Sequence, residues 1–165
     1  MQIKNLRKNF FINSFIIVLI FLLDRISKIY VINLDKKFFG SEIFSSKFLN
    51  ISLIWNEGIA FGFFSFSDKD AYNAFTILIL LIISGILFLM LKSKGLERYS
   101  LLMILGGALG NVFDRIFTNA VPDFIDFHIG NFHWFIFNIA DIFITLGVVF
   151  MIILELFKNK KVETI

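Results

Sequence analysis

The feature of this sequence that most limits its fold is a set of four long runs of uncharged, mostly apolar residues. They cover residues 10–23, 74–91, 99–113 and 142–154. A helix needs about 20 such residues to cross the hydrocarbon core of a bilayer, and only the second run comes near that length unaided. The other three reach it when the ionisable residues at their ends are included. The pattern predicts four membrane-spanning helices with charged groups near one end.

The composition supports a membrane protein. Hydrophobic residues make up 58% of the 165 residues and charged residues 18%, whereas soluble domains contain about 45–50% and about 25%. A soluble chain of this length could not bury so much apolar surface. We expect an all-α membrane protein that forms a single domain over residues 1–165. Its spans are expected at about 10–32, 72–91, 98–116 and 137–157.

Other residue counts exclude several function classes. The chain has no cysteine, which rules out disulfides, thiolate metal sites and cysteine nucleophiles. The net charge is +3, and the basic residues are scattered rather than gathered in a patch. The sequence therefore shows no sign of nucleic-acid binding.

Lysine and arginine flank the predicted spans unequally. Nine of them lie in the N-terminal segment, in the loop at 92–98 and in the C-terminal tail, and four lie in the segment 33–71. None lies between residues 116 and 134. Basic residues concentrate on the cytoplasmic side of membrane proteins. We therefore expect both termini in the cytoplasm and outer loops at 33–71 and 117–136.

The outer loops carry signs of further structure. Apolar and polar residues alternate over 48–55, which is typical of a short strand, and 124–129 could supply another. The segment 59–64 is too apolar for a solvated loop. We expect it to form an interfacial loop or half-helix that dips into the membrane interface or covers a groove.

The acidic residues near the apolar runs are predicted to share one depth. Asp24 lies fourteen residues beyond Phe10, which places it about 21 Å along the first span, in the outer half of a core about 30 Å thick. The third span ends, and the fourth begins, on that same side. The acids expected at the outer face with Asp24 are Asp114, Asp123, Asp126 and Asp141.

Two groups of polar residues have structural interpretations beside functional ones. Asp24 and Lys28 are four residues apart, so they share a helix face and can form an ion pair. The pair could have the structural role of neutralising two charges inside the membrane, or the functional role of positioning substrate or water. A second polar cluster consists of Asn111, Asp114 and Arg115. In it, we expect the positive charge of Arg115 to neutralise the neighbouring Asp114. Small residues at 106–108 and 110 would let a neighbouring helix approach closely.

Asp123 and Asp141 differ from Asp24 and Asp114, because neither has a basic residue nearby in the sequence. Two such carboxylates that approached each other would repel and would share a proton. The ionised member could then deprotonate water while the protonated one donates to a peptide carbonyl, as in aspartic proteases. The spacing leaves two alternatives open: Asp126 could replace Asp123, or the acids could lie apart and face water.

Other functions fit the residues less well. His128 and His133 lack a HExxH arrangement, and we expect them to face solvent rather than bind zinc. No G-x-S-x-G motif is present. The alternative function is that of a non-enzymatic transporter or proton-relay protein. Such a protein would need polar residues along the inner halves of its spans, and in this sequence those inner halves are almost wholly apolar.

Five motifs, in order along most of the chain, resemble those of the bacterial lipoprotein signal peptidases (signal peptidase II). They are Asp24-x-x-x-Lys28, Asn56-x-Gly58-x-Ala60-Phe61, Gly107-Ala108-Leu109-Gly110-Asn111-x-x-Asp114-Arg115, Val121-x-Asp123-Phe124 and Phe137-Asn138-x-Ala140-Asp141. One departure is Pro122, where an apolar β-branched residue is expected. Because proline is restricted to strand edges, we expect a bent strand there.

The resemblance implies a fold, a substrate and a site. The fold is four membrane helices with a small outer-face β element in the bacterial cytoplasmic (inner) membrane, and the active site lies at the outer face. The substrate is a prolipoprotein with a diacylglyceryl group on a cysteine, cut just before that cysteine. Globomycin-type peptides would inhibit the enzyme, and no metal or cofactor is implied. We also expect a monomer.

By the same resemblance, Asp123 and Asp141 are the catalytic pair. Eight further residues would support the site or contact the substrate: Asp24, Lys28, Asn56, Gly58, Asn111, Asp114, Arg115 and Asn138.

Overall fold

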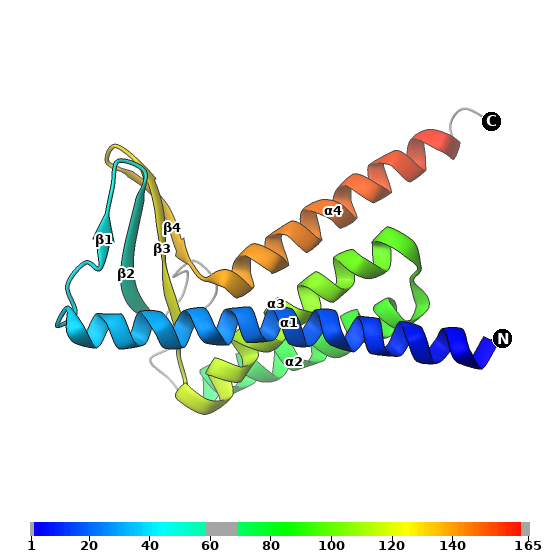
Figure 1. Ribbon diagram of the computed structural model, residues 1–165, viewed down its shortest axis with the longest axis horizontal. Helices are drawn as coiled ribbons and strands as arrows, with labels where there is room; N and C mark the ends of the chain where they lie inside the picture. Colours follow the sequence, from blue (N-terminus) through cyan, green and yellow to red (C-terminus); the bar gives the residue numbers. More distant parts are fainter. Residues whose placement is uncertain (1, 59–68, 163–165) are drawn as a thin grey trace.

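A computed structural model of the protein describes residues 2–58 and 69–162 as a helical bundle with a sheet at one end (Figure 1). The helices are α1 (Gln2–Lys37), α2 (Lys69–Lys92), α3 (Gly95–Thr118) and α4 (Ile139–Val162). The strands are β1 (Phe44–Ser45), β2 (Leu49–Asn56), β3 (Val121–Ile129) and β4 (Phe132–Phe137). Each of the four segments predicted to span a membrane overlaps one of these helices, and α1 is longer than predicted at both ends.

Within the described residues, three helices are long and apolar enough to cross a membrane: Asp70–Lys92 of α2, all of α3, and Ile139–Lys158 of α4. Helix α1 is not among them. Large apolar side chains lie exposed on the outer surfaces of α2 and α4, as Leu81 and Ile152 illustrate. Helices that are apolar on their outer surfaces are typical of a membrane protein, which confirms that part of the prediction.

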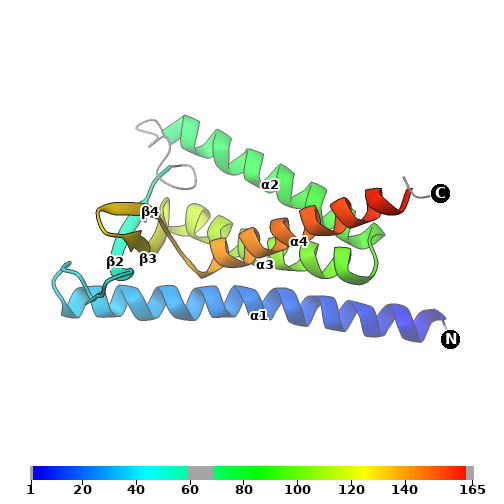
Figure 2. The same ribbon diagram turned by 90° about the horizontal axis from the view of Figure 1, so that it is seen from above.

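Helix α3 lies at the centre of the bundle and contacts α1, α2 and α4 (Figure 2). Its buried side includes Leu101, Leu102 and Leu105, and these belong to the main apolar core. Because α3 touches every other helix, residues near its end can reach side chains from all parts of the bundle.

The small residues of α3 allow these close contacts, as predicted. A Cβ added at Gly110 would lie 2.5 Å from Asp24 Oδ2 of α1, and one at Gly106 would lie 2.8 Å from the Cβ of Ile20. A Cβ at Gly107 would collide with the backbone carbonyl oxygen of Ala140 in α4. The glycines therefore let α1 and α4 pack directly on the backbone of α3.

The four strands form one antiparallel sheet in the order β1-β2-β3-β4. It lies at the end of the bundle opposite to the start of α1 and the end of α4 (Figure 1). The strands expected over 48–55 and 124–129 are confirmed as β2 and β3. Strand β4 was not predicted, because its sequence is apolar without alternation. The expected interfacial segment 59–64 lies outside the described residues.

Pro122 fits the sheet for a simple reason. It pairs with Trp55 of β2, while the pairing of β3 with β4 begins only at Ile125. Pro122 therefore lies where β3 has one neighbouring strand, and a missing backbone donor is tolerated there. The irregular step in the pairing lies beyond it, where β2 inserts one extra residue between Ile51 and Ile54.

We predict that Gly107→Ala destabilises the fold by roughly 1–3 kcal/mol, as overpacking of a tight contact does. The added methyl group meets the backbone of α4, which cannot rotate away. Gly85→Ala in α2 is the matched control, because its added Cβ meets nothing within 4 Å. Thermal unfolding in detergent should show a lower Tm for Gly107→Ala only. Equal Tm values for both variants would contradict the packing described.

Candidate active site

The start of α4 holds Asp141 in a fixed position. Asn138 immediately precedes the helix, and its side-chain Oδ1 accepts a hydrogen bond from the backbone N–H of Asp141 at 3.1 Å. In return, the backbone N–H of Asn138 donates to Asp141 Oδ2 at 3.1 Å. This reciprocal pair is a capping box with Asn and Asp in the two roles. The spacing between the two residues thus serves both to begin the helix and to orient the carboxylate.

The side chain of Asn138 also connects Asp141 to Asp123 in β3. Its Nδ2 donates to Asp123 Oδ1 at 2.5 Å and to Asn111 Oδ1 at 3.2 Å. The second oxygen of Asp123 accepts from Asn56 Nδ2 at 2.8 Å. Asp141 Oδ1 accepts from Asn111 Nδ2 at 2.8 Å. Each carboxylate is therefore held by two uncharged donors, and Asn138 bonds to both.

The sheet places Asn56 beside Asp123. Asp123 is paired with Ile54 in the ladder, and Asn56 lies two residues further along β2. Residues two apart in a strand point to the same face, so Asn56 is a diagonal neighbour of Asp123. The amide of Asn56 is fixed in turn, because its Oδ1 accepts from the backbone N–H of Gly58 at 3.0 Å.

Burial and the nearby charge of Asp141 raise the pKa of Asp123 from 3.8 to about 6. Burial is the larger cause, since Asp123 is only 4% exposed. Hydrogen bonds from Asn56 and Asn138 and the charge of Lys28 lower the pKa and offset part of this rise. The site thus favours a protonated carboxyl group close to a second carboxylate.

Lys28 connects this acid pair to the rest of the bundle. Its Nζ lies 2.9 Å from Asp24 Oδ1 and 2.7 Å from Asp114 Oδ2, and it donates to Asn111 Oδ1 at 2.8 Å. The pairing of Asp24 with Lys28 is as predicted. Because Lys28 occupies the Oδ1 atom of Asn111, the amide nitrogen of Asn111 is left to face Asp141. A buried cation therefore fixes the orientation of an uncharged donor.

The predicted compensation of Asp114 by Arg115 is wrong. Asp114 pairs instead with Lys28 and with Arg25 of α1, whose guanidinium bonds to both of its carboxylate oxygens. Arg25 Nη2 also lies 2.7 Å from Asp24 Oδ2. Neighbouring residues on a helix point in directions about 100° apart, so Asp114 faces α1 while Arg115 does not. Sequence reasoning missed Arg25, although a charged residue inside an apolar helix is a signal of a functional site.

Arg115 helps to hold the end of β2. Its Nη2 donates to the backbone carbonyl of Gly58 at 3.2 Å, and its Nη1 donates to that of Asn111 at 3.4 Å. Its charge also interacts with the carboxylates of Asp123 and Asp141. Arg115 therefore lies at the edge of the acid pair without pairing directly with either acid among the described residues.

The structure brings all ten residues singled out from the sequence into one connected network. They are Asp24, Lys28, Asn56, Gly58, Asn111, Asp114, Arg115, Asp123, Asn138 and Asp141. Asp126 is excluded from it. It lies three residues after Asp123, so its side chain points to the opposite face of β3, where its Oδ2 lies 2.8 Å from His133 Nδ1.

An apolar pocket of about 440 Å³ lies beside Asp141, between the sheet and α4. Its volume is typical of small-molecule or side-chain binding sites. Among the described residues that line it, Asp141 is the only ionisable one, so the pocket offers apolar contact next to one carboxylate. The lining consists of Phe127, Trp134, Phe135, Phe137, Asp141, Ile142, Thr145 and Leu146.

Comparison with known proteins gives consistent matches over most of the chain. The profile of the family described as "Signal peptidase (SPase) II" matches residues 16–157. The chain is 52% identical to a lipoprotein signal peptidase of Pelagibacter ubique (strain HTCC1062), over 93% of both chains. It is 39% identical to a lipoprotein signal peptidase of Anaplasma phagocytophilum (strain HZ), over 86% of this chain and 89% of that one.

Two solved structures have the same fold. Both are described as bacterial membrane enzyme structures obtained by the in meso method. One superposes with a TM-score of 0.76 at 29% identity and covers 90% of both chains. The other has a TM-score of 0.73 at 32% identity, over 87% of this chain and 92% of that chain.

We predict that Asp123 makes the stability of the protein fall as pH rises from about 4 to about 6. Its folded-state pKa of about 6 lies above the ordinary value of 3.8, so the folded protein keeps a proton that the unfolded chain releases in this window. The stabilisation from this proton is present below the window and lost above it. Asp123→Asn removes the effect. Its Tm relative to the unmodified protein should therefore rise between pH 4 and pH 7, and a constant difference would contradict the raised pKa.

Proposed function

The chain belongs to the signal peptidase II family of aspartic peptidases, which remove signal peptides from lipoproteins, and on this premise we propose that Asp123 and Asp141 are its catalytic pair. The observation that carries the proposal is the bridge through Asn138, which bonds to both carboxylates. Asp123 lies in β3 and Asp141 in α4, so the fold brings two sequence-distant acids to one place.

The proposed reaction is peptide hydrolysis by the two carboxyl groups. The ionised member of the pair takes a proton from a water molecule, and the resulting hydroxide attacks the carbonyl carbon of the scissile bond. The protonated member donates its proton to the carbonyl oxygen. When the tetrahedral intermediate collapses, the leaving amine takes a proton from the first carboxyl group, and a hydroxyl group of the intermediate returns a proton to the second. The raised pKa of Asp123 supports a shared proton near neutral pH.

The neighbouring residues have supporting roles in this proposal. Asn56, Asn111 and Asn138 hold the carboxylates with uncharged donors, which fix their positions without locking either in the ionised form. A direct lysine or arginine partner would favour the ionised form and weaken the proton donor. The buried cation Lys28 instead pairs with two other carboxylates, those of Asp24 and Asp114.

The proposed substrate is a prolipoprotein whose cysteine carries a diacylglyceryl group, cut just before that cysteine. Two features support it. The apolar pocket beside Asp141 offers space for apolar parts of the substrate next to the reacting bond. A lipid-anchored residue also stays at the membrane surface, which is the depth that we infer for the acids. Globomycin-type peptides would inhibit by occupying the same region.

We further propose that the chain is a single membrane domain with four spans, in which α1 joins α2, α3 and α4. The start of α1, the connection from α2 to α3 and the end of α4 are all at the end of the molecule opposite to the sheet (Figures 1 and 2). This arrangement agrees with both termini in the cytoplasm and the acid pair at the outer face of the bacterial inner membrane. A monomer suffices, because one chain supplies all ten residues of the network.

The alternative function, a transporter or proton-relay protein, has less support. The central core around α3 is apolar, with Ile83, Met90 and Leu102 among its residues. The buried charged network lies at the sheet end of the bundle. Among the described residues, it does not extend as a polar path through this core.

We predict that Asp123→Asn and Asp141→Asn each reduce cleavage of a diacylated precursor by at least about 10²–10⁴-fold, the contribution typical of a general acid or base. Asparagine keeps the shape of the side chain but cannot exchange the proton. Cleavage by the purified proteins would be followed on gels.

Asp35→Asn is the matched control, since it makes the same chemical change in α1 near the sheet end. It should cleave normally. Full activity in either Asp123→Asn or Asp141→Asn would refute the assigned pair. A precursor without the lipid should be cut poorly by the unmodified enzyme, and equal rates on both precursors would remove the proposed role of the diacylglyceryl group.

A further inference from the structure

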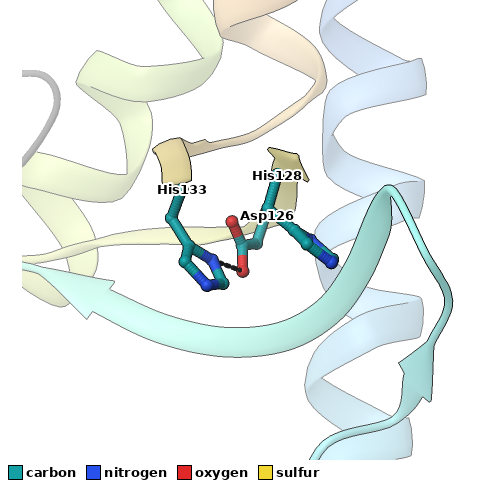
Figure 3. A group of neighbouring side chains, drawn as sticks. All are labelled: Asp126, His128 and His133. Carbon is teal, nitrogen blue, oxygen red and sulfur yellow. Dashed lines mark hydrogen bonds and ion pairs between the residues drawn. The ribbon is translucent and has the colours of Figure 1, made fainter. Parts of the chain in front are cut away.

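A second cluster of ionisable side chains lies on the sheet, apart from the acid pair. Asp126 and His128 of β3 and His133 of β4 lie next to one another (Figure 3). One possible ligand atom from each residue lies within 4.8 Å of those of the other two. The sequence gives no sign of this cluster, because the pairing of His128 with His133 is set by the β3–β4 register.

Two buried polar atoms of this cluster have no hydrogen-bond partner among residues 2–58 and 69–162. They are Asp126 Oδ1 and His128 Nδ1, and both are inaccessible to solvent. Asp126 is 6% exposed and His128 9%. The expectation that both histidines face solvent is therefore wrong for His128. Buried polar atoms without a partner are unfavourable and call for an explanation.

We propose that Asp126, His128 and His133 form a binding site for a divalent transition-metal ion, and specifically for zinc. Two imidazoles and one carboxylate are a frequent ligand set for zinc. An ion with His128 Nδ1, Asp126 Oδ1 and a nitrogen of His133 as its ligands would satisfy both unpaired atoms. A water molecule would complete a tetrahedron.

The geometry requires only small movements. Neighbouring ligands in a tetrahedral zinc site lie about 3.3 Å apart, so the three ligand atoms must approach by about 1.5 Å at most from their separation of up to 4.8 Å. His133 can supply this movement, because 53% of its side chain is exposed. The two imidazole rings are already stacked, with centroids 5.0 Å apart.

This site is structural rather than catalytic. Asp126 lies on the face of β3 opposite to Asp123, so a bound ion would not face the acid pair. It would instead join β3 to β4. The strand β3 carries Asp123, and β4 leads directly into Asn138. A metal ion here would therefore restrain the two segments that hold the acid pair together.

Zinc binding to purified full-length protein without a polyhistidine tag tests the proposal. The chain has two histidines and no cysteine, so few other residues could bind zinc tightly. Isothermal titration with zinc chloride in detergent should show one equivalent bound per chain. His133→Ala should weaken binding at least about tenfold, as losses in metal sites do. Asn131→Ala, at an exposed position of the same hairpin, should bind like the unmodified protein.

Two further measurements separate this site from the acid pair. Zinc should raise the Tm of the unmodified protein and not that of His133→Ala. The double variant Asp123→Asn/Asp141→Asn should bind zinc normally, whatever its activity. The proposal is overturned if the unmodified protein binds no zinc, if His133→Ala binds equally well, or if binding is lost in the double variant, which would place the ion at the acid pair.

Discussion

The structure depends on the mutual neutralisation of four charged side chains, three of them buried and one partly buried, where α1 meets α3. Asp24, Arg25 and Lys28 come from α1, and Asp114 comes from α3. Removing charges from water is costly unless each is paired and hydrogen-bonded. Two cations and two anions meet that condition together. Gly110 makes the contact possible, because any side chain there would occupy the position of the Asp24 carboxylate.

The acid pair is kept apart from those cations by uncharged amides. Asn111 accepts from Lys28 and donates to Asp141, and Asn138 bonds to Asn111 and to both acids. The charged network therefore fixes the positions of the amides, and the amides fix the acids. Because no cation bonds directly to either acid among the described residues, one carboxyl group can keep its proton, as an aspartic peptidase requires.

The sequence predicted the four helices and the strands over 48–55 and 124–129, because apolar runs and the alternation over 48–55 are local signals. It also predicted that Asp24 and Lys28 pair, which follows from helical spacing alone. The sequence could not predict partners from different elements. The pairing of Arg25 with Asp114 depends on how α1 packs on α3. The pairing of His128 with His133 depends on the register of β3 with β4. The choice of Asp123 over Asp126 came from family resemblance, and strand alternation gives its physical reason.

The central claim is that Asp123 and Asp141 lie close enough to share a proton. Infrared difference spectroscopy of the carboxylic acid carbonyl band, recorded during a pH titration, tests it most directly. A protonated carboxyl group of the unmodified protein should titrate near pH 6, and Asp141→Asn should lower this midpoint because it removes the neighbouring charge. A midpoint near 3.8, the ordinary value for aspartate, or one that Asp141→Asn leaves unchanged, would contradict it.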